Sequence, residues 1–174
     1  MWPGLYTSKV KDSVGVDENI NQIMITRGIV HEKPGHVHFS VKALLDSTAL
    51  LNKALLDGPY REQALVPSSP WLDDSPPEMP QVTVTNKNDT LLVQWTHLNK
   101  SDVFQWVVYY QQGTSWKYRI LNYAEKEIRI PVNTKVFNRD SKETETEWVT
   151  RVAVSAVDRV SNESGRAVIQ NIGK

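Results

Sequence analysis

Two histidines separated by a single residue, His36 and His38, are the side chains best placed for chemistry in this sequence. They lie in the segment GHVHFSV, where apolar Val37 alternates with them and predicts a β-strand over residues 36–41. Side chains at positions i and i+2 of a strand point the same way, so the pair could hold a metal ion. A suitable third ligand is missing close by, because His31 lies on an expected loop and His97 lies in the second domain. We therefore expect neither a metal nor another cofactor.

The carboxylates of the first third of the chain form no evident catalytic pair. Hydrolysis of a glycosidic bond requires two carboxyl groups on either side of that bond. No acidic residue in positions 1–66 falls within an expected strand, and Asp12, on a loop after the first strand, is the best placed. Asp17 and Asp46 have the positions of helix N-caps. The catalytic residues are therefore unknown from the sequence.

Aromatic residues of the second half offer a third kind of chemistry. Trp116 and Tyr118 alternate on one expected strand and therefore share a face. If exposed and roughly coplanar, their rings would form a platform for a glycan. The alternative is that they pack against neighbouring strands, which is a common use of aromatic residues in sheets. An exposed Trp116 would favour the glycan platform, and a buried Trp116 would favour packing between strands.

The overall composition narrows the class of protein. The 174 residues include 20 basic and 20 acidic residues and no cysteine. Balanced charge argues against nucleic-acid binding, and the lack of cysteine excludes disulfides and thiolate metal sites. No apolar run approaches the roughly 20 residues of a transmembrane helix. The opening residues WPGLYTSK also lack the basic and apolar segments of a signal peptide.

The first 66 residues follow a strand–helix order that predicts a parallel sheet. We expect strands over 2–7 and 36–41, a helix capped by Asp17 after the first, and a helix capped by Asp46 or Ser47 after the second. Two parallel strands alone leave both edges bare. We therefore expect this part to be stabilised by the rest of the chain or by a second copy in a homo-oligomer.

A stiff segment and an all-β domain follow. Residues 67–80 contain five prolines and form a linker, on which Trp71 and Leu72 are expected to dock against a surface. From residue 81 the apolar period is two, which predicts seven short strands in a β-sandwich over residues 81–174. The polar stretch 134–146 reads as a loop.

The sandwich resembles a fibronectin type III domain, an immunoglobulin-like fold. The resemblance rests on alternating apolar residues in three of the expected strands and covers residues 81–174. It departs from the pattern at Val152, where a tyrosine is usual. The matching residues are Leu91, Val93 and Trp95, then Val107, Val108 and Tyr109, then Val152, Val154, Ala156 and Asp158.

The first part is similar to the end of the bacterial glycosyl hydrolase-like family ten. The similarity is carried by the segments WPGLY at 2–6, GHVHFS at 35–40 (with Gly35 first), GPYR at 58–61, ALVP at 64–67 and PWL at 70–72. The family implies a (β/α)8 barrel followed by a fibronectin-like domain, so 1–66 would be its last two βα units. It also implies that both histidines line the barrel lumen.

This resemblance implies a function as well. Active sites of such barrels lie at the carboxyl ends of the strands, which points to Tyr6, His38 and Ser40 as residues that contact substrate. The chain would be the C-terminal portion of an exported, periplasmic or envelope-associated glycoside hydrolase, with a glycan as partner and no catalysis of its own. The alternative is a non-catalytic carbohydrate-binding, adhesion or spacer module.

Overall fold

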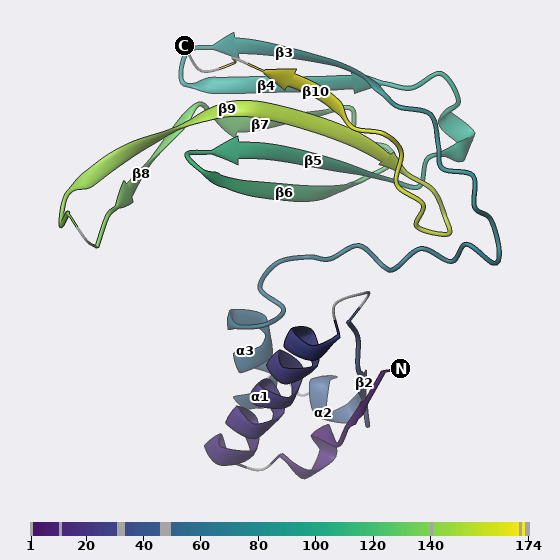
Figure 1. Cartoon of the computed structure of the whole chain (residues 1–174), viewed down its shortest axis with the longest axis vertical. Coiled ribbons are helices and arrows are strands. Elements are labelled where there is room, and N and C mark those ends of the chain that lie inside the picture. The colour runs from purple at the N-terminus through teal and green to yellow at the C-terminus, as the bar shows by residue number, and fades with distance from the viewer. Residues whose placement is uncertain are drawn as a thin grey trace. The chain divides into compact units, whose positions relative to one another are not determined.

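A computed structural model describes residues 2–10, 12–30, 34–45, 50–139, 141–170 and 172. The chain forms two compact units, Met1–Gln63 and Ala64–Lys174, which Figure 1 shows in one view. Each unit has its own hydrophobic core. Among the described residues, no helix combines the length and apolar character needed to cross a bilayer.

The first unit contains two short strands and their helices. Its elements are β1 (Gly4–Leu5), η1 (Thr7–Lys9), α1 (Ser13–Ile29), β2 (Val37–His38), α2 (Lys42–Leu45) and α3 (Leu50–Asp57). The strands pair in parallel, with Gly4 opposite Val37 and Leu5 opposite His38. The strand–helix–strand pattern thus predicted the parallel pairing, but each strand is shorter than expected. Among the described residues each of these strands pairs with one neighbour, so few ladder hydrogen bonds extend it.

Helix α1 begins earlier than the sequence suggested. Asp12 is the N-cap, and its side chain accepts a hydrogen bond from the Gly15 amide at 2.9 Å. The expected cap Asp17 instead lies inside the helix, where its side chain is exposed. The helix begins after Asp12 because the carboxylate of this residue accepts from a first-turn amide that has no partner within the helix.

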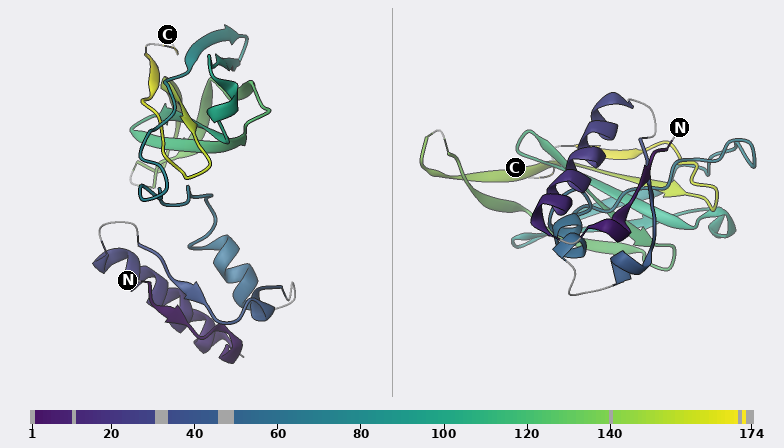
Figure 2. Two further views of the ribbon diagram at one scale, coloured as in Figure 1. Left: turned by 90° about the vertical axis from the view of Figure 1, so that its right-hand side faces the viewer. Right: turned by 90° about the horizontal axis from the view of Figure 1, so that it is seen from below.

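The second helical region is divided into α2 and α3. The expected caps Asp46 and Ser47 lie outside the described residues. Leu51 and Leu55 of α3 are buried, and they form one core with Leu5 of β1 and with Val16 and Ile23 of α1. The helices therefore cover one face of the two-stranded sheet, as Figure 2 also shows.

The second unit is a sandwich of two antiparallel sheets (Figure 1). One sheet has the order β3-β4-β7 and the other β10-β9-β5-β6, with β8 paired to β9. This arrangement confirms the expected all-β sandwich. The strands are β3 (Gln81–Lys87), β4 (Thr90–Thr96), β5 (Gln105–Gln112), β6 (Ser115–Asn122), β7 (Glu127–Pro131), β8 (Asn133–Phe137), β9 (Thr144–Val157) and β10 (Ala167–Gln170), with a short η2 (Lys100–Asp102).

Alternating residues of the strands form the core of the sandwich. Trp95 of β4 and Trp106 of β5 lie 6.0 Å apart between ring centres and are almost fully buried. The side chains of Val152 and Val154 of β9 are fully buried beside them. Val152 therefore contributes apolar packing to the core.

The region 134–146 is largely a hairpin, which corrects the expectation of a loop. Strand β8 pairs with the first part of β9, from Asn133 opposite Trp148 to Phe137 opposite Thr144. Figure 1 shows this hairpin projecting beyond the other strands of the sandwich. Backbone hydrogen bonds along the ladder stabilise it although its side chains are mostly polar, so composition alone was misleading.

The proline-rich segment belongs to the second unit. The Ser69 amide donates to the Val160 carbonyl at 2.9 Å, and the Asn162 side chain donates to the Asp73 carbonyl at 2.9 Å. The prediction that Trp71 and Leu72 dock on a surface is wrong, since they are 78% and 70% exposed. Backbone groups of the segment, one amide and one carbonyl, attach it to the sandwich instead.

Candidate functional site

The two-stranded sheet of the first unit has one open face. Tyr6, Val37, Phe39 and Val41 are 52–65% exposed there, while Leu5 on the opposite face is 2% exposed. An apolar surface of this kind, rimmed by polar residues, marks a site that contacts another molecule or another part of a protein. We call this surface the open face.

Two aromatic rings stand where the parallel strands end. Tyr6 follows β1 and Phe39 follows β2, and their ring centres lie 5.7 Å apart at an angle of 62°. The Lys9 ammonium nitrogen lies 5.0 Å from the centre of the Tyr6 ring. The structure thus brings Tyr6, one of the predicted substrate residues, together with Phe39 and Lys9, which the sequence did not single out.

Ser40, another predicted substrate residue, lies at the same end of the sheet. Its amide donates to the Ser8 hydroxyl at 3.0 Å, and its carbonyl accepts from the Thr7 hydroxyl at 3.2 Å. The Ser8 and Ser40 hydroxyl oxygens are 3.3 Å apart. These bonds fasten η1 to the end of β2, so they hold in place the backbone that carries Tyr6 and Phe39.

His38 points the other way, together with His36. His38 is in register with Leu5, and residues in register on paired strands share a face, so both histidines lie on the helical side. Both imidazole Nε2 atoms contact the Tyr60 hydroxyl, and the His38 contact measures 2.6 Å. The expectation that the histidines line a barrel lumen is therefore corrected, because Tyr60 and the helical core occupy their side.

The surroundings of this cluster disfavour charge on the histidines. Burial lowers the pKa of His36, and the neighbouring His38 and Arg27 lower it further. Burial also lowers the pKa of His38 and raises the pKa of Tyr60. The three groups are thus held neutral near pH 7 and form a hydrogen-bonded support for β2. Tyr60 stands in the GPYR segment, but its partners could not be found from sequence spacing.

The acidic and metal-ligating residues considered from the sequence form no catalytic or metal site among the described residues. Asp12 caps α1, so its carboxylate is committed to a backbone amide. Within the part of the chain that the structure describes, no three His, Cys, Asp or Glu side chains are grouped as metal ligands.

The proposed glycan platform on β6 is partly accessible. Trp116 is 49% exposed, and Tyr118 is half-buried on the same face of the strand. Tyr118 lies opposite Tyr109 of β5, with ring centres 6.2 Å apart and planes tilted by 46°. The rings of this second pair are therefore not coplanar.

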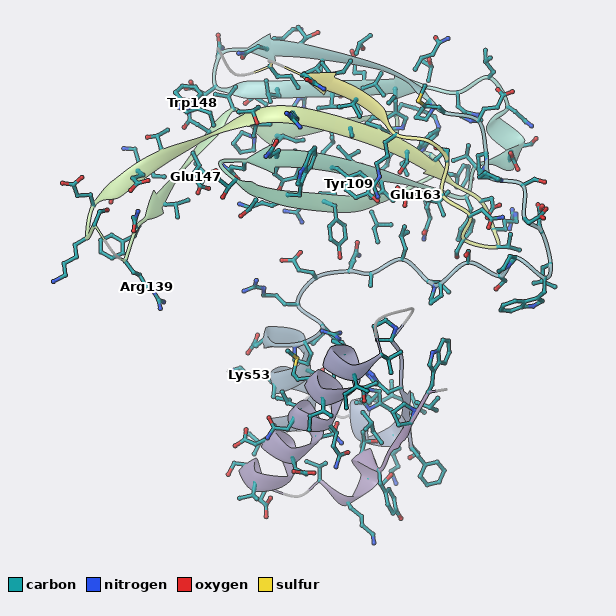
Figure 3. The ribbon with its side chains drawn as sticks, in the orientation of Figure 1. Lys53, Tyr109, Arg139, Glu147, Trp148 and Glu163 are labelled. Atoms are coloured by element: carbon teal, nitrogen blue, oxygen red, sulfur yellow. The ribbon has the colours of Figure 1, made fainter. Side chains whose placement is uncertain are left out.

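A charged cluster beside these rings escaped the sequence analysis. The Glu163 carboxylate accepts hydrogen bonds from the hydroxyls of Tyr109 and Ser155, each at 2.7 Å, and pairs with Arg166 at 3.2 Å. Figure 3 shows Tyr109 and Glu163 side by side. Burial and the Glu163 carboxylate raise the pKa of Tyr109 to about 12. Glu163 follows an ordinary turn sequence, so only the tertiary structure reveals this role.

The fold defines a class of molecule in which an open α/β unit is joined to a β-sandwich. Comparison with known proteins identifies a relative of this chain. The sequence is 28% identical over 153 residues to the glycosyl hydrolase YngK of Bacillus subtilis, covering 85% of this chain and 28% of that protein. The chain therefore spans less than a third of the relative's length. No protein-family model matches the sequence.

Solved structures give fainter likenesses. The glycoside hydrolase domain of Endo-D from Streptococcus pneumoniae is 24% identical and covers 58% of this chain and 16% of that one, with a TM-score of 0.40. A fibronectin type III domain of human collagen XX is 13% identical and covers 62% of this chain and 99% of that one, with a TM-score of 0.36. The link of this chain with glycoside hydrolases accordingly rests on the Bacillus relative.

Proposed function

We propose that this chain is the C-terminal portion of an exported glycoside hydrolase, consisting of the last two βα units of a (β/α)8 barrel and a fibronectin type III-like accessory domain. The observation that supports this most directly is the open face. It exposes apolar side chains of two parallel strands whose other face packs against helices. In a closed parallel sheet both faces are covered, so further strands of a barrel would bury Val37 on β2. Tyr6 and Phe39 follow the strand ends and would stand at the carboxyl-end mouth of the barrel.

The chain by itself is proposed to lack hydrolytic activity. Asp12 is used as a helix cap, and a pair of carboxylates across a cleft is needed for hydrolysis. The catalytic acids would come from strands upstream in the same protein. The partner of the whole protein is a glycan, and the protein works outside the cytoplasm, where polymeric glycans are met.

Fragment complementation tests the proposal. The chain is mixed with the part of the Bacillus relative that it does not align with, and hydrogen exchange is followed at the Phe39 amide, which donates to the Leu5 carbonyl at 2.8 Å. We expect a stoichiometric complex, stronger protection of β1 and β2, and sugar release from a polysaccharide panel only by the complex.

A matched pair of variants makes the test specific. Val37→Asp places a charge on the open face and should prevent the complex from forming, because the apolar contact is lost. Val168→Asp, at a similarly exposed site of the sandwich, should leave it unchanged. The proposal fails if the wild-type chain does not bind, or if it releases sugar alone.

A second candidate function is glycan binding by the sandwich, as a carbohydrate-binding or adhesion module. The half-exposed Trp116 on the same face as Tyr118 favours it. Affinity electrophoresis in polysaccharide gels checks this function. Retardation of the wild type that Trp116→Ala removes would support it, and equal mobility in gels with and without polysaccharide would contradict it.

A further inference from the structure

The carboxyl end of the two-stranded sheet combines three features of a saccharide-binding site. These are exposed aromatic rings, hydroxyl groups and a charge, held on a backbone fixed by hydrogen bonds. Sites for small ligands commonly join aromatic surface with a few convergent polar groups. The features lie outside the His36–Tyr60–His38 cluster, which faces the helices.

The aromatic rings form a corner. Phe39 is 65% exposed and Tyr6 is 52% exposed, and their planes meet at 62°. One ring can therefore contact the apolar C–H face of a pyranose while the other borders its edge. Neither ring is needed for the unit's own core, which contains Leu5 and the apolar residues of the helices. Burying such aromatic surface is favourable for a ligand as it is for a core.

Polar groups border this corner on the η1 side. Ser8 and Ser40 present hydroxyls that can donate to and accept from sugar hydroxyls. Lys9 is exposed, and its ammonium lies 5.0 Å from the centre of the Tyr6 ring. A cation held beside an aromatic surface attracts an anionic group on a ligand that stacks there. A neutral sugar lacks this attraction between opposite charges.

We propose that Tyr6, Phe39 and Lys9 form a subsite for a sugar unit that carries a carboxylate, such as a uronic acid. The proposal deepens the function proposed above, since it gives that protein's substrate an acidic character. Phe39 provides the stacking surface, Tyr6 the bordering wall, and Lys9 the charge. Thr7 and Ser8 act as positioning residues, because they bind the backbone of Ser40.

Binding of two matched probes to the full chain tests the subsite. Methyl glucuronide and methyl glucoside differ in a carboxylate and are titrated while the backbone amide signals of residues 6–9 and 39–40 are followed by NMR. We expect both sugars to shift these signals and the glucuronide to bind about fivefold more tightly at low salt, as a single exposed ion pair allows. Added salt should reduce this preference.

Three variants separate the contributions. Lys9→Met should abolish the preference for the glucuronide and leave the glucoside unaffected. Phe39→Ala should weaken both sugars by about tenfold, in line with the loss of an aromatic contact. Phe137→Ala, a similarly exposed aromatic site on the projecting hairpin of the sandwich, should change neither.

The outcomes also separate this subsite from the function proposed above. No shift at these residues, equal binding of the two sugars, or a preference that survives Lys9→Met would overturn the subsite, even if the fragments complement each other. Glucuronide-selective binding without complementation would support the subsite and refute the barrel parentage.

Discussion

At the scale of single residues, the shared hydroxyl of Tyr60 determines the state of both histidines. A phenol has one hydrogen, so it can donate to one imidazole and accept from the other. The two rings therefore hold their protons on different nitrogens. The Nδ1 atoms of His36 and His38 are buried without a hydrogen-bond partner among the described residues. On the ring whose proton is on Nε2, a second proton would lie on Nδ1, where nothing among the described residues accepts it. A charge on either ring would also lie next to the other ring, and a charge on His36 would lie near Arg27.

This arrangement predicts that the first unit is sensitive to acid. The pKa values of both histidines lie below the ordinary 6.5 in the folded state, so the unfolded chain takes up protons first. Their contribution to stability is complete above pH 6.5 and is lost as the pH falls toward the folded values. Hydrogen exchange at the Phe39 amide should therefore accelerate below pH 6.5, relative to intrinsic rates.

The internal control for this experiment is the Val149 amide, which donates to Val132 within the sandwich and should show no such change. His38→Gln should reduce the pH dependence of exchange at Phe39. Protection that stays constant over about two pH units below 6.5 would contradict the role assigned to the cluster.

Glu163 controls the ionisation of Tyr109 in the second unit. Its carboxylate and burial raise the pKa of Tyr109 to about 12, and hydrogen bonds from Tyr109, Ser155 and Arg166 lower the pKa of Glu163 despite burial. Glu163→Gln removes the charge, and Tyr109 should then titrate at a lower pH in a spectrophotometric titration. Glu147→Gln, on the projecting hairpin, is the control and should not shift the curve. An unchanged tyrosine titration in Glu163→Gln would show that this pair is not coupled.

At the scale of elements, the end of α3 is fixed by a close approach of backbone. A Cβ atom on Gly58 would lie 2.8 Å from the carbonyl oxygen of Ala54, whereas a Cβ on Gly28 near the end of α1 would meet nothing within 4 Å. The residues after Gly58 bring Tyr60 to the histidines. The sequence identified Gly58 and Pro59 as a helix stop, and the structure shows which contact requires the glycine.

The two glycines therefore respond differently to alanine. Gly58→Ala should destabilise the first unit by about 1–3 kcal/mol, as overpacked sites do. Gly28→Ala should be neutral or stabilise it by up to about 1 kcal/mol, because alanine has the higher helix propensity. Urea dependence of hydrogen exchange in β1 and β2 measures both. If both substitutions changed the free energy of unfolding equally, the close approach at Gly58 would not require a glycine.

At the scale of the whole molecule, the proline-rich segment expected as a linker is attached to the second unit. Residues 67–80 contact the sandwich through Ser69 and Asp73, and the Glu78 carbonyl contacts the His97 ring at 2.7 Å. Along the chain, the first compact unit ends at Gln63 and the second begins at Ala64. A proline-rich composition predicts a stiff segment, but whether it is free or attached depends on partners far along the chain.

The second unit should consequently fold alone from residue 64. Circular dichroism and amide spectra of residues 64–174 should match those of the sandwich in the full chain, with one cooperative thermal transition. Residues 81–174 should unfold at a lower temperature, because they lack the contacts of the proline-rich segment. Equal stability of the two fragments would show that this segment contributes nothing.

The sequence by itself determined the order of elements, the parallel pairing in the first unit and most strands of the sandwich. Local periodicity and turn residues carry this information, and they act over a few residues. Periodicity also showed that His36 and His38 share one face of a strand and Val37 and Phe39 the other. It could not say which face meets the core, and the histidines turned out to face the helices.

Only the tertiary structure decided the remaining features. Tyr60 meets the histidines, Glu163 meets Tyr109, and β8 finds the start of β9 through contacts between residues distant in sequence. Such pairings depend on the summed packing of whole elements, which no local pattern encodes. The exposed apolar face of β1 and β2 likewise becomes visible only when the helices are seen to cover the opposite face.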